Sequence, residues 1–271
     1  MTLDELENLL RGFGQESCEL HDKVFRDLSS ASVALFAINS CPAGEQLELA
    51  GSGTLVSRGG SYWILTASHV WEKKLKTATA LGIGVRRGID HRFPIAIDSI
   101  AVRGFSPKGR EAEWGPDLCL LRIPAVYVGT IEADKVAFEW GAIRQLGPGV
   151  DGFEMNYLIG CPASLGTFTL THAAVRTECF VVNRVATYMK EGLDYLDMDA
   201  YVDDSAKLRS FRGVSGGGLW NVKFYVDPAK DEPAWIWSLE GLAFYEFPIQ
   251  GQSAIIRCHG PNSIDAAIIE P

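Results

Sequence analysis

Three short motifs contain the residues of this sequence that are best suited to nucleophilic chemistry. His69 ends the run TASH, Asp117 lies in GPDLCLL, and Ser215 lies in GVSGGGL. A serine hydroxyl is a weak nucleophile at neutral pH and needs an adjacent base, which an imidazole can supply. A buried carboxylate can fix the tautomer of that imidazole and stabilise its cationic form. The three motifs together predict acyl transfer through an activated serine.

The glycines around Ser215 have a function in that chemistry. Without side chains they let the backbone turn sharply and leave room for a substrate. The N–H groups of Gly213 and Ser215 can then converge on the oxyanion that develops at the attacked carbonyl. Taken singly, each motif has an ordinary structural explanation: a structural histidine at His69, a turn or cap residue at Asp117, and a flexible turn or anion-binding nest at the glycines. Only their combination predicts the reaction.

The elements that must position these residues are short strands. From Ser32 onward the sequence consists of runs rich in Val, Ile, Thr and aromatic residues, separated by Gly, Pro, Asp and Asn. One set lies in residues 32–140 and the other in residues 152–271, which include a C-terminal tail, and a Gly- and Pro-containing passage around residues 140–151 is the expected linker. Two sets of about six strands, without alternating long helices, predict an all-β fold of two antiparallel six-stranded β-barrels.

Residues 1–31 differ from the rest and form an expected helical segment. Leucines recur near helical spacing at its start, and a second helical stretch is predicted over residues 18–28. Such a segment can pack on the outside of the domain. Alternatively, it can serve as a docking or regulatory segment.

The overall composition excludes several classes of protein. The 271 residues are 47% hydrophobic, which permits a sizeable core and argues against a disordered chain. No run approaches the roughly 18 apolar residues that a membrane-spanning helix needs, and the N-terminus lacks the pattern of a signal peptide. With 25 basic and 34 acidic residues the formal charge is −9, so the average surface would repel nucleic acid. We therefore expect a cytoplasmic protein with neither nucleic acid nor membrane as a partner.

The cysteines are scattered along the chain, and no two have the CxxC spacing of a zinc or redox site. Their even number permits three disulfides, which stays the alternative interpretation. Several of them lie in apolar strand-like runs, where a buried free cysteine behaves as a small hydrophobic residue. We predict free thiols in a reducing compartment. The six are Cys18, Cys41, Cys119, Cys161, Cys179 and Cys258.

The three motifs resemble those of the chymotrypsin/trypsin family of serine proteases, in the same order and at similar spacing. His69 and Asp117 are 48 residues apart, and Asp117 and Ser215 are 98 apart. The run GSGTLV at residues 51–56 is similar to the strand that precedes the histidine motif. The run YLIGCP at residues 157–162 is similar to an early strand of the second barrel in bacterial members. The resemblance spans about residues 32 to 260.

This resemblance implies a double β-barrel with the active site in the cleft between the barrels. Ser215 would be the nucleophile, His69 the general base and then acid, and Asp117 the orienting carboxylate. The backbone amides of Gly213 and Ser215 would form the oxyanion hole. The substrate would be a protein or peptide, and no metal or organic cofactor is required.

Some positions depart from the family pattern. Val70 and Phe211 replace two cysteines of the secreted digestive members, which agrees with the prediction of free thiols. Val214 replaces the aspartate that, in zymogen-activated members, pairs with a newly exposed N-terminus. We therefore expect no activation by an inserted N-terminus. Control would come from a regulatory protein partner or from the N-terminal segment, or would be absent.

The specificity pocket has two candidate residues. Arg209 stands six residues before the serine, where the base of the pocket lies in trypsin-like members, and a cation there would favour an acidic substrate residue. Alternatively, Arg209 points to solvent or pairs with Glu246 or with an aspartate at position 203 or 204. Tyr245, in the run GLAFYE, stands where the pocket wall usually carries an aromatic residue.

The sequence thus predicts a serine endopeptidase that forms an acyl-enzyme intermediate, a specific processing protease that acts on a protein partner. The main alternative is a pseudoprotease, in which the same fold serves as a binding module. Two others are an esterase or another acyl transferase with the same three residues, and a viral-type polyprotein-processing protease. A fluorophosphonate label on Ser215 would separate an enzyme from a binding module.

Overall fold

The structure is a computed structural model that carries all side chains. It describes residues 1–12, 14–42, 44–85, 92–105, 114–141, 150–168, 173–202, 208 and 210–269. Arg209 and most of the expected linker around residues 140–151 lie outside these residues. No helix in the described part is both long enough and apolar enough to cross a membrane.

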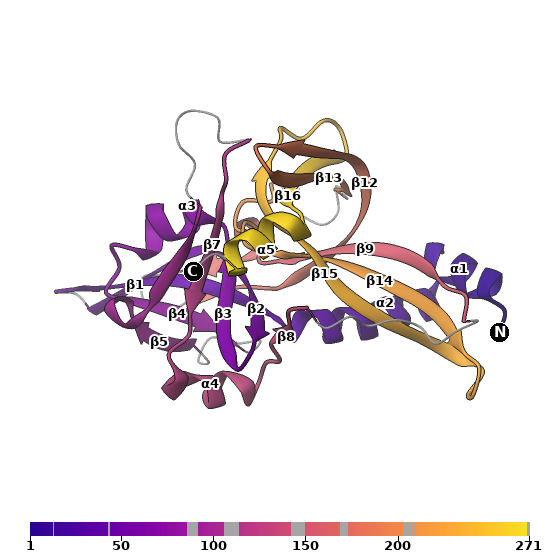
Figure 1. The fold of residues 1–271 in the computed structure, drawn as a ribbon, viewed down its shortest axis with the longest axis horizontal. Coiled ribbons are helices and arrows are strands. Elements are labelled where there is room, and N and C mark those ends of the chain that lie inside the picture. Colours follow the sequence, from indigo (N-terminus) through magenta and orange to yellow (C-terminus); the bar gives the residue numbers. More distant parts are fainter. Residues whose placement is uncertain are drawn as a thin grey trace.

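Two helices occupy the N-terminal segment, where the leucine spacing predicts them: α1 (Leu3–Arg11) and α2 (Gln15–Ser29). A capping box starts α1, in which Thr2 and Glu5 satisfy each other's backbone N–H groups. Val24 and Leu28 of α2 are buried against residues of the second barrel. In Figure 1, α2 runs alongside β9 (Phe153–Gly160) and β14 (Gly218–Asp227) of that barrel.

The first half of the chain forms one curled, largely antiparallel sheet. Its strand order is β5-β4-β1-β2-β3-β7-β6, and the short β8 pairs in parallel with β2. The strands are β1 (Ser32–Cys41), β2 (Gly44–Arg58), β3 (Ser61–Thr66), β4 (Ala80–Gly84), β5 (Arg92–Ala96), β6 (Ala101–Phe105), β7 (Leu118–Arg122) and β8 (Phe138–Glu139).

This sheet differs from the expected six-stranded barrel in two respects: its described part has eight strands, and its two edges do not pair with each other there. Its edge strands β5 and β6 are joined by a short 3-10 turn, Ile97–Ser99, and no ladder pairs them in the described residues. A single bent segment therefore pairs with β4 at its start and with β7 at its end. The sheet curls into a half-barrel, and covalent continuity of the chain replaces the last ladder.

The second half of the chain forms a closed, six-stranded barrel, as expected. Its order is β12-β13-β16-β15-β14-β9, and β9 pairs back onto β12. The strands are β9 (Phe153–Gly160), β12 (Glu178–Lys190), β13 (Leu193–Tyr201), β14 (Gly218–Asp227), β15 (Glu232–Glu246) and β16 (Ser253–His259). The all-β fold class built from two curled sheets is thus confirmed.

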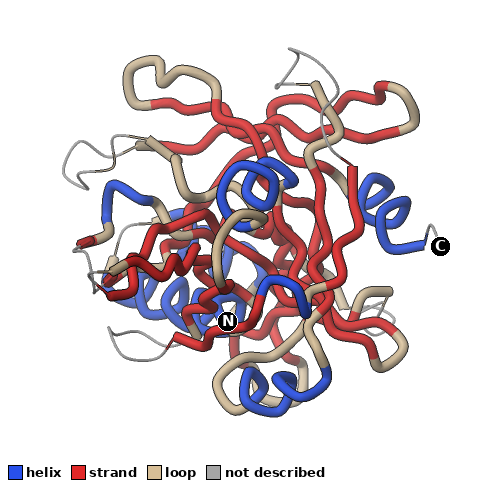
Figure 2. Tube along the Cα trace, turned by 90° about the vertical axis from the view of Figure 1, so that its left-hand side faces the viewer, coloured by secondary structure: helices blue, strands red, loops and turns tan. Residues whose placement is uncertain are grey.

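The remaining elements are short. These elements are α3 (Ser68–Val70) with the π-helical segment Trp71–Leu75, α4 (Ala125–Glu132), the 3-10 turn Ala163–Leu165, β10 (Thr167–Phe168), β11 (Ala173–Ala174) and α5 (Pro261–Ile269). Figure 2 shows α5 against the outer side of the strands, next to the C-terminus.

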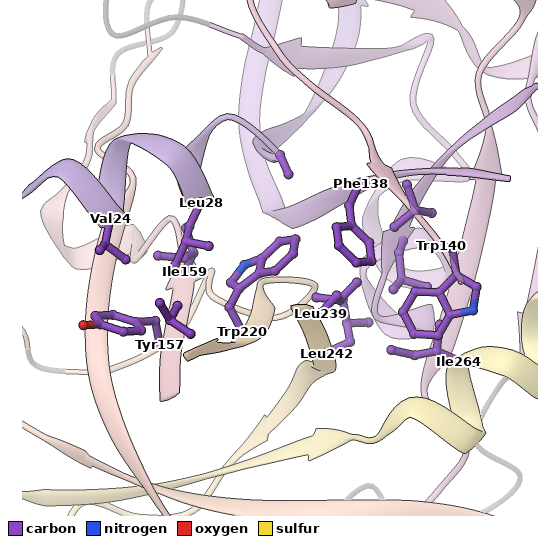
Figure 3. Packing of buried hydrophobic residues seen from close by; sticks show 14 of the residues in the cluster. Val24, Leu28, Phe138, Trp140, Tyr157, Ile159, Trp220, Leu239, Leu242 and Ile264 are labelled. Carbon is purple, nitrogen blue, oxygen red and sulfur yellow. The ribbon is translucent and has the colours of Figure 1, made fainter. Parts of the chain in front are cut away.

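One hydrophobic cluster joins the two sheets and the helices. Trp220 of β14 is fully buried and meets Phe138 of β8 edge to face, with ring centroids 5.6 Å apart. Leu28 of α2 and Ile264 of α5 belong to the same cluster (Figure 3). Burial of a large apolar side chain stabilises a fold by about 1.5–3 kcal/mol. This cluster therefore holds the first sheet against the second barrel and sets the relative position of the residues between them.

Candidate active site

Strand pairing brings the histidine and aspartate motifs together. In the antiparallel pair β3 and β7, Thr66 lies opposite Cys119. The residues that follow β3 therefore lie beside those that precede β7. His69 is in α3, directly after β3, and Asp117 is the residue before β7.

Both carboxylate oxygens of Asp117 accept hydrogen bonds from His69. Oδ2 lies 2.6 Å from Nδ1 of the ring, and Oδ1 accepts the backbone N–H of His69 over 2.8 Å. The Asp117 side chain is 6% exposed, whereas that of His69 is 28% exposed. Because an ionised carboxylate can only accept, the proton of the ring lies on Nδ1 and Nε2 is left as a proton acceptor.

A second histidine supports Asp117 from the other barrel. Nε2 of His259, at the end of β16, accepts the backbone N–H of Asp117 over 3.0 Å. The ring is fully buried and stacks on Phe244 with centroids 4.3 Å apart. Burial lowers the pKa of His259 to about 4, with the negative charge of Asp117 acting in the opposite direction. His259 could not be identified from the sequence, because a single histidine at the end of an apolar strand carries no motif.

Ser215 lies on a tight loop that precedes β14. The loop contains two glycines with positive φ, Gly213 at 96° and Gly216 at 89°. A Cβ at Gly216 would lie 2.0 Å from the carbonyl oxygen of Ser52, and one at Gly213 would lie 2.5 Å from that of Cys161. Both positions therefore require glycine for two reasons, backbone conformation and space.

Ser52 of β2 anchors this loop to the first sheet. Its backbone N–H donates to the carbonyl of Ser215 over 2.8 Å, and its Oγ donates to the carbonyl of Gly213 over 2.7 Å. The same Oγ accepts the N–H of Cys161 over 2.8 Å. Ser52 lies in the run at residues 51–56, but the sequence does not indicate its function, because a serine in a strand has many potential partners.

Some backbone N–H groups of the loop are hydrogen-bonded within the protein and others are not. Those of Val214, Gly216 and Gly217 donate to backbone carbonyls over 2.7–2.8 Å. In the described part of the chain, the N–H groups of Gly213 and Ser215 have no such partner. Two free donors are thus available at the positions that the sequence predicts for an oxyanion hole.

His69, Gly213 and Ser215 line one cavity of about 490 Å³. Asp117 is linked to it through His69. The contacts among the described residues include no hydrogen bond between Ser215 and Nε2 of His69; such bonds are often long in free enzymes and shorten when substrate binds. The other lining residues are Leu47, Glu48, Leu49, Ala50, Lys73, Lys74, Ala163 and Arg212.

Val214 is buried, as expected from its apolar character. It belongs to an apolar cluster with Phe211, Leu219 and Ala243. A Cβ at Gly160 would lie 2.8 Å from its side chain, so the packing around Val214 is tight. The position beside the nucleophile is therefore held by apolar contacts.

The two specificity candidates have different outcomes. Arg209 lies outside the described residues. Tyr245 is half-buried and packs edge to face on Phe247, with centroids 5.0 Å apart, and it is not among the residues that line the 490 Å³ cavity. Its place in a specificity pocket stays a prediction. Glu246, one expected partner of Arg209, accepts the N–H of Phe211 over 2.9 Å.

All six cysteines are free. Cys18 and Cys41 are exposed, whereas Cys119, Cys161 and Cys258 are buried. Burial raises the pKa of Cys119 to about 12, so its thiol stays protonated at neutral pH. Within the described ranges, no three His, Cys, Asp or Glu side chains lie close enough together to hold a metal ion.

No protein-family model and no curated protein matches the chain. Among solved structures, the protease of tobacco vein mottling virus is 12% identical to this chain, with a TM-score of 0.41. The match covers 91% of this chain and 84% of the viral protease chain. A structure concerned with the coupled folding and binding of the Sesbania mosaic virus VPg protein is 13% identical, with a TM-score of 0.41. That match covers 87% of this chain and 88% of the other chain. Likenesses of this strength do not indicate a function.

Proposed function

We propose that this chain is a serine endopeptidase in which Ser215, His69 and Asp117 form the catalytic triad. The observation that carries the proposal is the pairing of His69 with both oxygens of Asp117 in a cavity that Ser215 also lines. Nε2 of His69 is the ring nitrogen left free to accept a proton. This combination supplies a nucleophile, a base and an orienting carboxylate within one site.

In the first half of the reaction, Oγ of Ser215 attacks the carbonyl carbon of the scissile peptide bond, and its proton passes to Nε2 of His69. The tetrahedral intermediate collapses when the carbon–nitrogen bond breaks, and His69 returns the proton to the leaving amine. Asp117 stabilises the imidazolium that forms between these two transfers. The product of this half is an acyl ester on Ser215.

In the second half, water attacks the acyl ester and His69 takes a proton from it. Collapse of this intermediate releases the acid and returns the proton to Oγ of Ser215. In both halves, negative charge develops on the carbonyl oxygen. The free N–H groups of Gly213 and Ser215 are the donors proposed to stabilise it.

The experiment that tests this proposal is active-site labelling with a fluorophosphonate probe. We expect the wild-type chain to be labelled at Ser215 and the Ser215→Ala variant to be unlabelled. Ser57→Ala is the matched control, because Ser57 lies on β2 and hydrogen-bonds to Glu139, away from the cavity. A folded wild-type chain that never reacts would contradict the proposal and favour a binding module. Turnover of ester substrates without any peptide substrate would favour an esterase.

We further propose a protein or peptide substrate and a cytoplasmic, reducing environment. The free state of all six cysteines supports the second point. A cleavage-site profile from a peptide library would identify the sequence that the enzyme prefers.

A further inference from the structure

The cavity beside Ser215 is positively charged, although the chain as a whole carries a formal charge of −9. Three cationic side chains line it: Lys73 and Lys74 from the π-helical segment Trp71–Leu75, and Arg212 from the loop before Gly213. Glu48 is the one carboxylate among the described lining residues. The cavity therefore concentrates cations on an otherwise acidic protein.

Lys74 and Glu48 neutralise each other. Nζ of Lys74 lies 2.6 Å from Oε1 of Glu48 and also donates to the carbonyl of Leu49 over 3.0 Å. Lys73 and Arg212 are exposed, and no described residue pairs with either of them. Among the described residues the cavity therefore keeps two positive charges without an ion-pair partner, and such a field attracts an anionic group.

The position of Lys73 relative to His69 indicates which part of a substrate it meets, and Arg212 lines the same cavity. Lys73 lies four residues after His69, about one helical turn further along the same segment. Because His69 must give its proton to the leaving amine, the leaving half of the peptide passes this segment. The apolar side chains of Leu47 and Leu49 on β2 line the same cavity and can contact the methylene groups of a longer side chain.

We propose that Lys73 and Arg212 bind an acidic side chain, Asp or Glu, one or two residues after the scissile bond. This inference rests on the proposed endopeptidase function and adds to it a substrate class. It is independent of Arg209, the residue predicted from the sequence for the base of the specificity pocket. Two solvent-exposed ion pairs are expected to favour an acidic over a neutral peptide by roughly 2- to 30-fold in kcat/KM. The preference should weaken as salt concentration rises.

The test uses two sets of three fluorogenic peptides. Within each set the peptides differ only by Glu, Gln or Lys, placed at the first position after the scissile bond in one set and at the second in the other. The acyl half is taken from a peptide that the wild-type chain cleaves. The Glu-to-Gln ratio of kcat/KM is measured for the wild type, Lys73→Ala, Arg212→Ala and the double variant. Lys76→Ala is the matched control, because Lys76 is an exposed lysine just beyond the same segment, where it pairs with Glu72 outside the cavity.

We expect each single variant to lower the ratio and the double variant to bring it close to 1, while Lys76→Ala keeps the wild-type ratio. Because each ratio compares two peptides on one protein, a general loss of activity cancels. A ratio that is the same in the wild type and the double variant would overturn the inference. If Ser215 is labelled and the Gln peptide is cleaved in that case, the proposed endopeptidase function still stands. Absence of both labelling and cleavage in the wild type would overturn the two proposals together.

Discussion

The backbone N–H of Asp117 donates a hydrogen bond to Nε2 of His259 over 3.0 Å. A fully buried histidine on the last strand of the second barrel thus holds a residue of the first sheet that is itself paired with His69. To accept this bond, Nε2 must be unprotonated, which requires the neutral form of the ring. The proton then lies on Nδ1, which has no hydrogen-bond partner among the described residues.

This arrangement predicts a pH-dependent contribution of His259 to stability. Its pKa is about 4 in the folded chain and 6.5 for the ordinary residue, so between these values the unfolded chain binds more protons. The contribution is therefore complete above about pH 6.5 and is lost progressively as the pH falls towards 4. The lost free energy of unfolding amounts to about 3 kcal/mol. Urea unfolding of the wild type and His259→Phe across this range measures it.

His259→Phe should show a shallower pH dependence than the wild type between pH 4 and 6.5. At pH 7.5 it should also be less stable by about 1–3 kcal/mol, since the N–H of Asp117 loses its buried acceptor. Parallel pH profiles for the two proteins would contradict the assignment.

The triad is tested by substitution of its members. Ser215→Ala and His69→Ala should leave the fold intact and lower turnover by roughly 10⁴- to 10⁶-fold, whereas Asp117→Asn should cost about 10⁴-fold. Turnover is measured on a peptide that the wild type cleaves, and circular dichroism checks the fold. Near-normal activity of Ser215→Ala would show that the mechanism is wrong.

Ser52→Ala is expected to lower activity although Ser52 does not take part in the reaction. The variant loses the side-chain bonds to Gly213 and Cys161, so the loop that carries the proposed oxyanion donors is less well held. A displacement of about 1 Å at such a site can cost up to about 100-fold, and we expect a 10- to 100-fold lower kcat. Ser57→Ala is the control, because it removes one hydrogen bond from the same strand, to Glu139. Equal kcat values for the two variants would argue against the role of Ser52.

The cysteines should react in two classes. In the folded chain the exposed Cys18 and Cys41 should react first with a thiol reagent, and all six should react after unfolding. Reductant should barely change the melting temperature, because no disulfide would be broken. Alkylation under non-reducing conditions, followed by mass spectrometry, counts the thiols. Three protected pairs in freshly purified protein would contradict both the free thiols and the reducing compartment.

Activity should not require proteolytic release of a new N-terminus. Val214 is buried among apolar side chains, and an ammonium group inserted beside it would lose its hydration without gaining a carboxylate partner. The chain of residues 1–271 should therefore react with a fluorophosphonate without prior cleavage, in the presence of a partner if one is needed. N-terminal sequencing of the labelled protein identifies the reactive form. Exclusive labelling of a form truncated before about residue 32 would instead indicate zymogen control.

Residue types and local patterns were enough to predict much of this protein. The β-rich runs predict the strands, because strand preference and turn residues act over a few neighbours. The motifs at His69, Asp117 and Ser215 are informative because each chemical group needs a particular local backbone, such as the positive φ at Gly213 and Gly216. The helices at the N-terminus follow in the same way from the spacing of leucines.

The tertiary structure alone decided the contacts that hold the site. Ser52 and Gly213 are 161 residues apart, and Asp117 and His259 are 142 apart. A serine or histidine within a strand has no local pattern that identifies such a partner. The contact depends on register, and a shift of one residue would turn the side chain to the opposite face of the sheet. The shape of the first sheet was also decided by tertiary structure. Its edges are known only from the pairing of β5 with β4 and of β6 with β7. Local chemistry thus determined which residues could react, and long-range strand pairing determined which other residues hold them in place.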